Sequence, residues 1–313
     1  MDSAADALVI MKLLSTNACM WNARRAGTAI PAFNIPFLPM MEAVAEALHD
    51  TDCFGLIAVA RPEWMKFEAG SVRAIYQEYQ RVKDERLTRL HLDHVPVIDE
   101  DNLSVDYEAI IQEAVQLGYQ SVMLDGSRLP LDENIQATKK IARLAHAAGI
   151  ALEGELGAVF GHEAGPLPPY EELFATGKGF TAAEDARRFV QETGVDWLSV
   201  AVGNVHGAIS EVTRHNKKVE ARLNIEHLER IYKAVQIPLV LHGGSGIKKK
   251  YIQEAIHRGI AKINIATAIR QPYEVALKES LEAAKKAAYD AVVQVLTEEL
   301  ELQGSRRLIN PEA

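Results

Sequence analysis

The 313-residue sequence lacks the features of a secreted, membrane-spanning or nucleic-acid-binding protein. It has only two cysteines, Cys19 and Cys53, and no CxxC spacing, which leaves no basis for a disulfide framework or a zinc knuckle. The net charge of −9 gives no support to binding nucleic acid or an anionic membrane. No apolar run is long enough to span a bilayer, and acidic residues stand where a signal peptide needs positive charge. We therefore expect a cytoplasmic protein with reduced cysteines and neither a nucleic-acid nor a membrane partner.

No GxGxxG follows the first apolar run, which argues against a doubly wound dinucleotide-binding fold. Instead, eight short apolar runs alternate with segments of helical periodicity. The expected strands are 30–33, 55–60, 87–93, 121–124, 151–156, 197–202, 239–241 and 262–265. Eight β-then-α units predict an α/β fold, the (β/α)8 TIM barrel. We expect residues 1–313 to form a single barrel domain with an N-terminal helical extension and a C-terminal helical region.

Three histidines stand at or just after the ends of expected strands. They lie in HLDH (91–94), GNVHG (203–207) and LHGGSG (241–246) and are His94, His206 and His242. The carboxyl ends of barrel strands meet at one rim, where three imidazoles can bind Zn²⁺ and leave one position open for substrate. A single strand-end histidine is usually structural, but three at one rim favour a metal site. His91 shares a strand face with Asp93, and we interpret it as an interior packing residue.

Carboxylates and amides occupy the same expected rim. Asp93 directly precedes His94 and is a candidate base. Asp125 and Glu155 end two adjacent strands, where they either accept N–H bonds from metal-binding imidazoles or form an alternative metal position. Both interpretations stay open at this point. Asn34 and Asn264 complete the rim.

Small residues follow the seventh strand, and a second motif ends the eighth. HGGSG (242–246) lets backbone N–H groups approach an anion, and KINIAT (262–267) lies beside it in a barrel. Loops after these two strands commonly bind phosphate in this architecture. Two long connections, 157–181 and 203–224, are expected to be functional lids. Metal, base and phosphate site together indicate a small-molecule sugar-phosphate substrate.

These motifs occur in one order along the chain: AFN (32–34), HLDH, SVMLDGS (121–127), ENIQATK (133–139), EGELG (153–157), HGGSGI (242–247) and KINIAT. From about residue 12 to residue 285 the sequence resembles the class II, zinc-dependent ketose-bisphosphate aldolases. The members it resembles most are fructose-bisphosphate and tagatose-bisphosphate aldolases. The resemblance implies reversible cleavage of a ketose phosphate or bisphosphate to dihydroxyacetone phosphate and an aldehyde. It further implies one catalytic Zn²⁺, admits a monovalent cation, and leads us to expect a homodimer or homotetramer.

The resemblance also implies roles for individual residues. His94, His206 and His242 would bind the zinc, and Asp93 would exchange a proton with the hydroxyl at the bond that breaks. Glu163, in the first long connection, would handle the proton on the enediolate carbon. The residues implied in substrate and donor-phosphate binding are Asn34, Gly207, Gly243, Ser245, Asn264 and Thr267. Arg270 matches an arginine that in some members reaches the distal phosphate of a neighbouring subunit's substrate.

The chain departs from the family pattern around the expected substrate. Ala266 and Ala268 stand where members commonly have carboxylates, and Ser210 stands where many have a lysine near the donor phosphate. Phe160 replaces a usual glycine, and AVARPEW follows the second strand in place of a small, polar loop. An alanine side chain accepts no hydrogen bond from a sugar hydroxyl. We therefore expect fructose 1,6-bisphosphate to be a poorer substrate than some other ketose phosphate, unless Arg61 or Lys178 supplies the missing contacts.

Two other functions remain compatible with these residues. A zinc-dependent sugar-phosphate epimerase or isomerase would use the same enediolate chemistry without releasing an aldehyde. A non-catalytic sugar-phosphate-binding protein could keep the scaffold alone. The presence of Asp93 beside three candidate metal ligands favours the aldolase, a carbon–carbon lyase.

Overall fold

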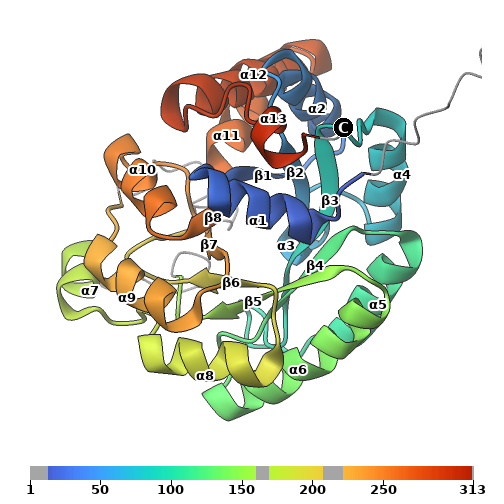
Figure 1. The fold of residues 1–313 in the computed structure, drawn as a ribbon. Helices are drawn as coiled ribbons and strands as arrows, with labels where there is room; N and C mark the ends of the chain where they lie inside the picture. Colours follow the sequence, from blue (N-terminus) through green and yellow to red (C-terminus); the bar gives the residue numbers. More distant parts are fainter. Residues whose placement is uncertain (1–12, 160–168, 207–220, 312–313) are drawn as a thin grey trace, which may run out of the picture.

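Eight parallel strands close into a barrel in the order of the sequence (Figure 1). The computed structural model describes residues 13–159, 169–206 and 221–311. The strands are β1 (Ile30–Asn34), β2 (Gly55–Ala60), β3 (Thr88–Pro96), β4 (Ser121–Asp125), β5 (Ala151–Leu156), β6 (Trp197–Val200), β7 (Leu239–Leu241) and β8 (Ile260–Ile265). The pairing of β1 with β8 completes the ring. The prediction of a (β/α)8 TIM barrel is confirmed.

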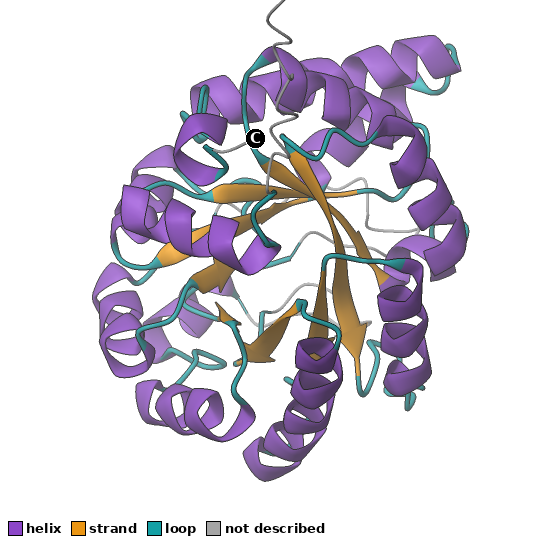
Figure 2. Ribbon diagram, turned by 45° about the vertical axis from the view of Figure 1, so that its right-hand side comes forward, coloured by secondary structure: helices purple, strands orange, loops and turns teal. Residues whose placement is uncertain are grey.

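Helices surround the strands on the outside, as Figure 2 shows. One long helix follows each strand: α2 (Met40–Asp50), α4 (Val72–Val82), α5 (Tyr107–Leu117), α6 (Leu131–Ala147), α8 (Ala183–Thr193), α9 (Ile225–Val235), α10 (Lys249–His257) and α11 (Thr267–Ala276). The other helical segments are α1 (Thr16–Ala26), α3 (Arg61–Met65), α7 (Tyr170–Thr176), α12 (Leu281–Gln294), the π-helix η1 (Val295–Glu299) and α13 (Arg306–Ile309). The sequence did not lead us to expect α3 or α7, which lie within connections after β2 and β5.

Helix ends follow local side-chain chemistry. The hydroxyl of Ser71 accepts a hydrogen bond from Ala74 N at the start of α4, and the Asp106 carboxylate does the same for Ala109 N at the start of α5. Gly118 ends α5 with a φ of 102°, a left-handed conformation that a residue with a side chain rarely adopts. These signals set the bounds of α4 and α5 through residues close in the sequence.

The N-terminal end of the barrel is apolar and covered by α1, which Figure 1 shows lying across it. Inside the barrel, a cluster of fully buried side chains includes Ile30, Leu56 and Trp197 and continues into Met20 of α1. Asn17 fastens α1 to the start of β6, since its amide donates to Asp196 Oδ1 (2.9 Å) and its oxygen accepts from Trp197 Nε1 (3.0 Å). The opposite end of the barrel is therefore the end left open for a site.

Within the described residues no helix has the length and apolar character needed to cross a membrane.

Candidate active site

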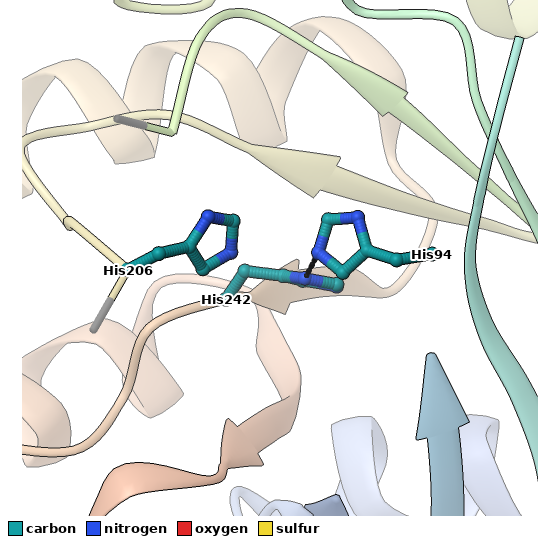
Figure 3. A group of neighbouring side chains, drawn as sticks. All are labelled: His94, His206 and His242. Carbon is teal, nitrogen blue, oxygen red and sulfur yellow. Dashed lines mark hydrogen bonds between the residues drawn. The ribbon is translucent and has the colours of Figure 1, made fainter. Parts of the chain in front are cut away.

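The three predicted metal-binding histidines meet at the C-terminal end of the barrel (Figure 3). His94 belongs to β3, His206 follows β6 and His242 follows β7. Each offers a ring nitrogen, and these three atoms lie within 4.8 Å of one another. His94 Nε2 and His242 Nδ1 are 2.6 Å apart, and the ring centroids of His94 and His206 are 5.0 Å apart. His94 thus meets two histidines that lie more than a hundred positions later in the sequence.

An irregularity in β3 turns His94 toward that point. Successive side chains of a regular strand face opposite sides, so Asp93 and His94 could not both face the barrel mouth. The register between β3 and β4 shifts between Leu92 and Val95, and His94 has a φ of 34°. Such a bulge inserts one residue and re-aims a side chain, often next to an active site. The predicted end of this strand at Asp93 was therefore wrong, because the strand continues past the bulge to Pro96.

Carboxylates hold the outer nitrogen of two of the rings. His94 Nδ1 lies 3.3 Å from Asp125 Oδ2, and His242 Nε2 lies 2.8 Å from Glu153 Oε1. An imidazole that donates its outer N–H to a carboxylate presents the lone pair of its inner nitrogen to a metal. The inner nitrogens are the pair that face each other in Figure 3. Two imidazoles oriented in this way, together with the nearby ring of His206, fit Zn²⁺ with an open coordination position.

 The two carboxyls beside His94, those of Asp125 and Glu155, differ in charge state. Burial and the nearby charge of Asp125 together raise the pKa of Glu155 to about 8. Burial also opposes ionisation of Asp125, but hydrogen bonds and charge from His94 outweigh it and bring the pKa to about 2. Asp125 is therefore the carboxylate that accepts the His94 N–H, while Glu155 Oε2 lies 3.9 Å from the same nitrogen. Because His94, Asp125 and Glu155 also form a set that could hold a metal ion, both interpretations of these acids stay open.

Asp93 is buried beside the three histidines and is kept ionised. Its Oδ2 accepts hydrogen bonds from the side-chain amides of Asn34 and Asn264, both at 2.9 Å. Burial disfavours the charge, but the Lys262 ammonium, 3.5 Å from Oδ1, and neighbouring imidazoles hold the pKa of Asp93 well below its ordinary value. A charged carboxylate at this position can accept a proton from a substrate hydroxyl.

Beneath the histidines lies a charged layer, which we define as His91, Asp93, Glu153 and Lys262. All four side chains are buried. Lys262 Nζ donates to Glu153 Oε2 at 2.6 Å and lies 3.1 Å from His91 Nε2. The sequence reasoning missed Glu153 and Lys262, although each stands two residues before a predicted rim residue and so shares its strand face. His91 is interior, as predicted, but it also has a polar contact, 2.9 Å from Ser121 Oγ, and is more than a packing residue.

The predicted substrate- and phosphate-binding residues that the structure describes line the same cavity as the histidines. Gly243 has a φ of 63°, and a Cβ there would lie 2.1 Å from the Val205 carbonyl oxygen, so only glycine fits. Ser245, Asn264 and Thr267 face this cavity from the β7 and β8 ends. Small residues and hydroxyls at this position leave space for an anion near backbone N–H groups.

For the remaining predicted residues, the structure gives either no description or a different environment. Phe160, Glu163, Gly207 and Ser210 lie outside the described residues. Arg270 lines the cavity but is buried and pairs with Glu274 of its own helix at 2.5 Å.

The two basic residues considered as substitutes for missing substrate contacts also have other surroundings. Arg61 pairs with Asp99 at 3.1 Å, and Lys178 lines a separate small pocket beside α7.

Sequence comparison accounts for this arrangement. The family model for class II fructose-bisphosphate aldolase matches residues 14–307. The chain belongs to this family. The resemblance inferred from the motifs is therefore confirmed, and family membership supports aldolase activity, a lyase reaction, on a sugar phosphate.

Solved structures agree with the family assignment. The YdjI aldolase from Escherichia coli K12 is 27% identical with a TM-score of 0.73, over 94% of this chain and 100% of that one. A putative fructose-1,6-bisphosphate aldolase from Coccidioides immitis is 26% identical with a TM-score of 0.72, over 92% and 96%. The fructose-bisphosphate aldolase from Campylobacter jejuni shares the fold at 22% identity, with a TM-score of 0.70 over 93% and 96%.

Proposed function

We propose that this aldolase depends on one Zn²⁺ held by His94, His206 and His242, and that it releases dihydroxyacetone phosphate and an aldehyde from a ketose phosphate. The observation that carries the proposal is the convergence of three imidazoles beside the ionised Asp93. Ser245 and Thr267 in the same cavity support binding of the donor phosphate. A zinc ion bound there would act as a Lewis acid toward the ketose carbonyl oxygen.

The chain's own residues account for the proton transfers. In the cleavage direction Asp93 accepts the proton of the hydroxyl on the carbon that becomes the aldehyde. That C–O bond becomes a carbonyl as the neighbouring carbon–carbon bond breaks, and the electron pair stays on the donor carbon. Glu163, by its match to the family pattern, delivers a proton to that carbon and completes dihydroxyacetone phosphate. Asn34 and Asn264 hold Asp93 in place throughout, because both donate to its Oδ2.

Metal analysis and one pair of variants test this proposal. The purified protein should contain about one zinc per chain, and His206→Ala should lose zinc and activity. Asp93→Asn should keep zinc but lose cleavage by roughly 10²-fold or more, because a general base contributes on that order. His49→Ala, at an exposed histidine on α2, is the matched control and should change neither zinc content nor rate. Full zinc and full activity in His206→Ala would contradict the metal assignment.

Product analysis separates the aldolase from the other two functions. Free aldehyde together with dihydroxyacetone phosphate supports aldol cleavage. Conversion of one sugar phosphate to an isomer, with no aldehyde released, would instead identify an epimerase or isomerase. Sugar-phosphate binding with no turnover would identify a binding protein. A cytoplasmic location, a single domain, a monovalent cation and a homodimer or homotetramer stay predictions.

A further inference from the structure

The short helix α3 brings a part of this chain that departs from the family pattern into the cavity. Ala60, the residue before α3, is paired in register with Asp93 across β2 and β3. The helix therefore begins directly beside the proposed base. Pro62, in its first turn, lines the cavity together with His94 and His206.

The carboxyl side chain of α3, that of Glu63, lies in this cavity. Only 7% of its surface is exposed, and it lines the cavity together with Asn34 and Asp93. One carboxyl oxygen, Oε2, accepts a hydrogen bond from Ala60 N at 2.5 Å. That contact fixes the direction of the side chain, and the carboxyl also interacts with the side chain of Asn34, so the group lies where a bound molecule would meet it.

Capping of α3 does not by itself explain this placement. A carboxylate that caps a helix normally lies in solvent, whereas Glu63 is buried near the carboxylate of Asp93. Burial, together with the charge of Asp93, raises the pKa of Glu63 well above its ordinary value and favours the neutral carboxyl. Contacts of α3 with the loop after β3 maintain this placement. Arg61 pairs with Asp99 at 3.1 Å, and Lys66 pairs with Glu100 at 2.5 Å, so the loop after β3 holds both ends of the helix.

The position of Glu63 relates it to one half of the substrate. The phosphate-binding residues lie at the ends of β7 and β8, whereas Asp93 acts on the hydroxyl of the carbon that leaves as the aldehyde. A group that lies beside Asp93 on the β2 side therefore meets the carbons of the aldehyde half.

The same side of the cavity is poorly suited to a second phosphate. Pro36, Pro62 and Phe67 make this wall apolar, and Ala266 adds no polar group. Of the Lys and Arg residues described, Arg270 alone lines the cavity, and its guanidinium is paired with Glu274 and lies 5.3 Å from the centre of the Phe67 ring. A phosphate here would meet the carboxyl of Glu63 and a cation that is already paired.

We propose that Glu63 is a specificity-determining residue that selects an aldehyde carrying a hydroxyl and no phosphate, so that the preferred substrates are ketose 1-phosphates. This inference rests on the proposed aldolase function. A carboxyl group hydrogen-bonds a hydroxyl in either protonation state, but it supplies no positive charge to a phosphate.

Aldol addition of dihydroxyacetone phosphate to glyceraldehyde and to glyceraldehyde 3-phosphate tests the proposal. The wild-type protein should favour glyceraldehyde, in kcat/KM, by roughly tenfold or more. Glu63→Gln should keep this preference within about threefold, because the amide also accepts a hydrogen bond from Ala60 N and can bond a hydroxyl. Glu63→Ala should lose roughly tenfold in kcat/KM with glyceraldehyde and change little with glyceraldehyde 3-phosphate, so that most of the preference is lost. Glu68→Gln, an exposed position in the same segment, is the matched control and should keep the wild-type preference.

Two further measurements separate this inference from the proposed function. Zinc content and solvent-proton exchange into dihydroxyacetone phosphate involve only the donor half, so Glu63→Ala should leave both within about twofold of wild type. Wild-type exchange with an unchanged aldehyde preference in Glu63→Ala would overturn the role of Glu63 alone. A wild-type preference for the phosphorylated aldehyde would do the same. A zinc-loaded wild type with neither exchange nor addition would overturn the proposed function and this inference with it.

Discussion

The two ends of the barrel interior are built from opposite chemistry. At the N-terminal end, an apolar layer that includes Ile30, Leu56 and Trp197 packs beneath α1, and the buried guanidinium of Arg89 at its edge donates its hydrogen bonds to backbone carbonyls. A few ångströms along the same strands, in the charged layer, Lys262 and Glu153 are equally buried. The apolar layer gains free energy from burial alone, whereas the charged layer is stable only while its partners remain together.

The change from one layer to the other follows the inward positions of single strands. Along β1 these positions run from Ile30 through Ala32 to Asn34, and along β5 they run from Ala151 through Glu153 to Glu155. Each strand therefore contributes to stability with its first residues and to chemistry with its last. Substitutions at the two ends should consequently differ in size, in pH dependence and in their effect on activity.

The largest effect is expected from removing the cation of the charged layer. Lys262→Met leaves the carboxylates of Asp93 and Glu153 buried without the ammonium that faces both. Loss of one partner from a buried ion pair typically costs about 3–5 kcal/mol. Urea unfolding followed by circular dichroism should show a loss of that size. Lys278→Met, at an exposed lysine of the loop after α11, should stay within about 0.5 kcal/mol of wild type. Equal stability of the two variants would show that the carboxyls of this layer are protonated.

A smaller effect should distinguish the layers by pH. Burial opposes the charge of Glu153, but Lys262 and His242 lower its pKa from 4.5 to about 2. A lowered pKa contributes stability that is complete above the ordinary value and is lost as the pH falls toward the folded value. In metal-free protein, Glu153→Gln should be less stable than wild type by roughly 2–3 kcal/mol near neutral pH, and this difference should shrink between about pH 5 and pH 3.

Leu56→Ala is the counterpart in the apolar layer. It removes no titrating group, so its loss of about 2–5 kcal/mol should be the same at each pH. A Glu153→Gln difference that is equally insensitive to pH would contradict the ionised state assigned to Glu153.

The smallest effect should come from loosening α1. Asn17→Ala removes the bonds to Asp196 and Trp197 and should cost about 1–2 kcal/mol, since a buried N–H is left without its acceptor. Because α1 lies at the end of the barrel opposite the histidines, aldolase rate and zinc content should not change. Arg25→Ala, at an exposed position of the same helix, is the control. A fall in rate for Asn17→Ala would show that the two ends are coupled.

Much of the barrel and its rim could be predicted because both depend on local patterns. Alternating apolar runs and helical segments predict the β/α order, and strand-end residues such as His94 and His242 follow from it. The bounds of β2, β5 and β7 match the structure because each is a short apolar run bordered by residues typical of turns.

Other features depend on contacts that sequence patterns do not express. The bulge that turns His94 is a shift in the pairing of β3 with β4. The ion pair of Lys262 with Glu153 joins residues from β8 and β5. The segment of α3 contains only five residues, too few for a helical period to be recognised. The direction of Glu63 comes from tertiary contacts of that helix.

The bulge in β3 has an evolutionary consequence. It makes a proposed metal ligand and the proposed base consecutive residues, so a single insertion or deletion nearby would displace both at once. Insertions and deletions near the bulge in β3 should therefore abolish the proposed reaction. The connection after β2 is not restricted in this way, and diversification of this family toward new substrates should accumulate there while HLDH stays unchanged.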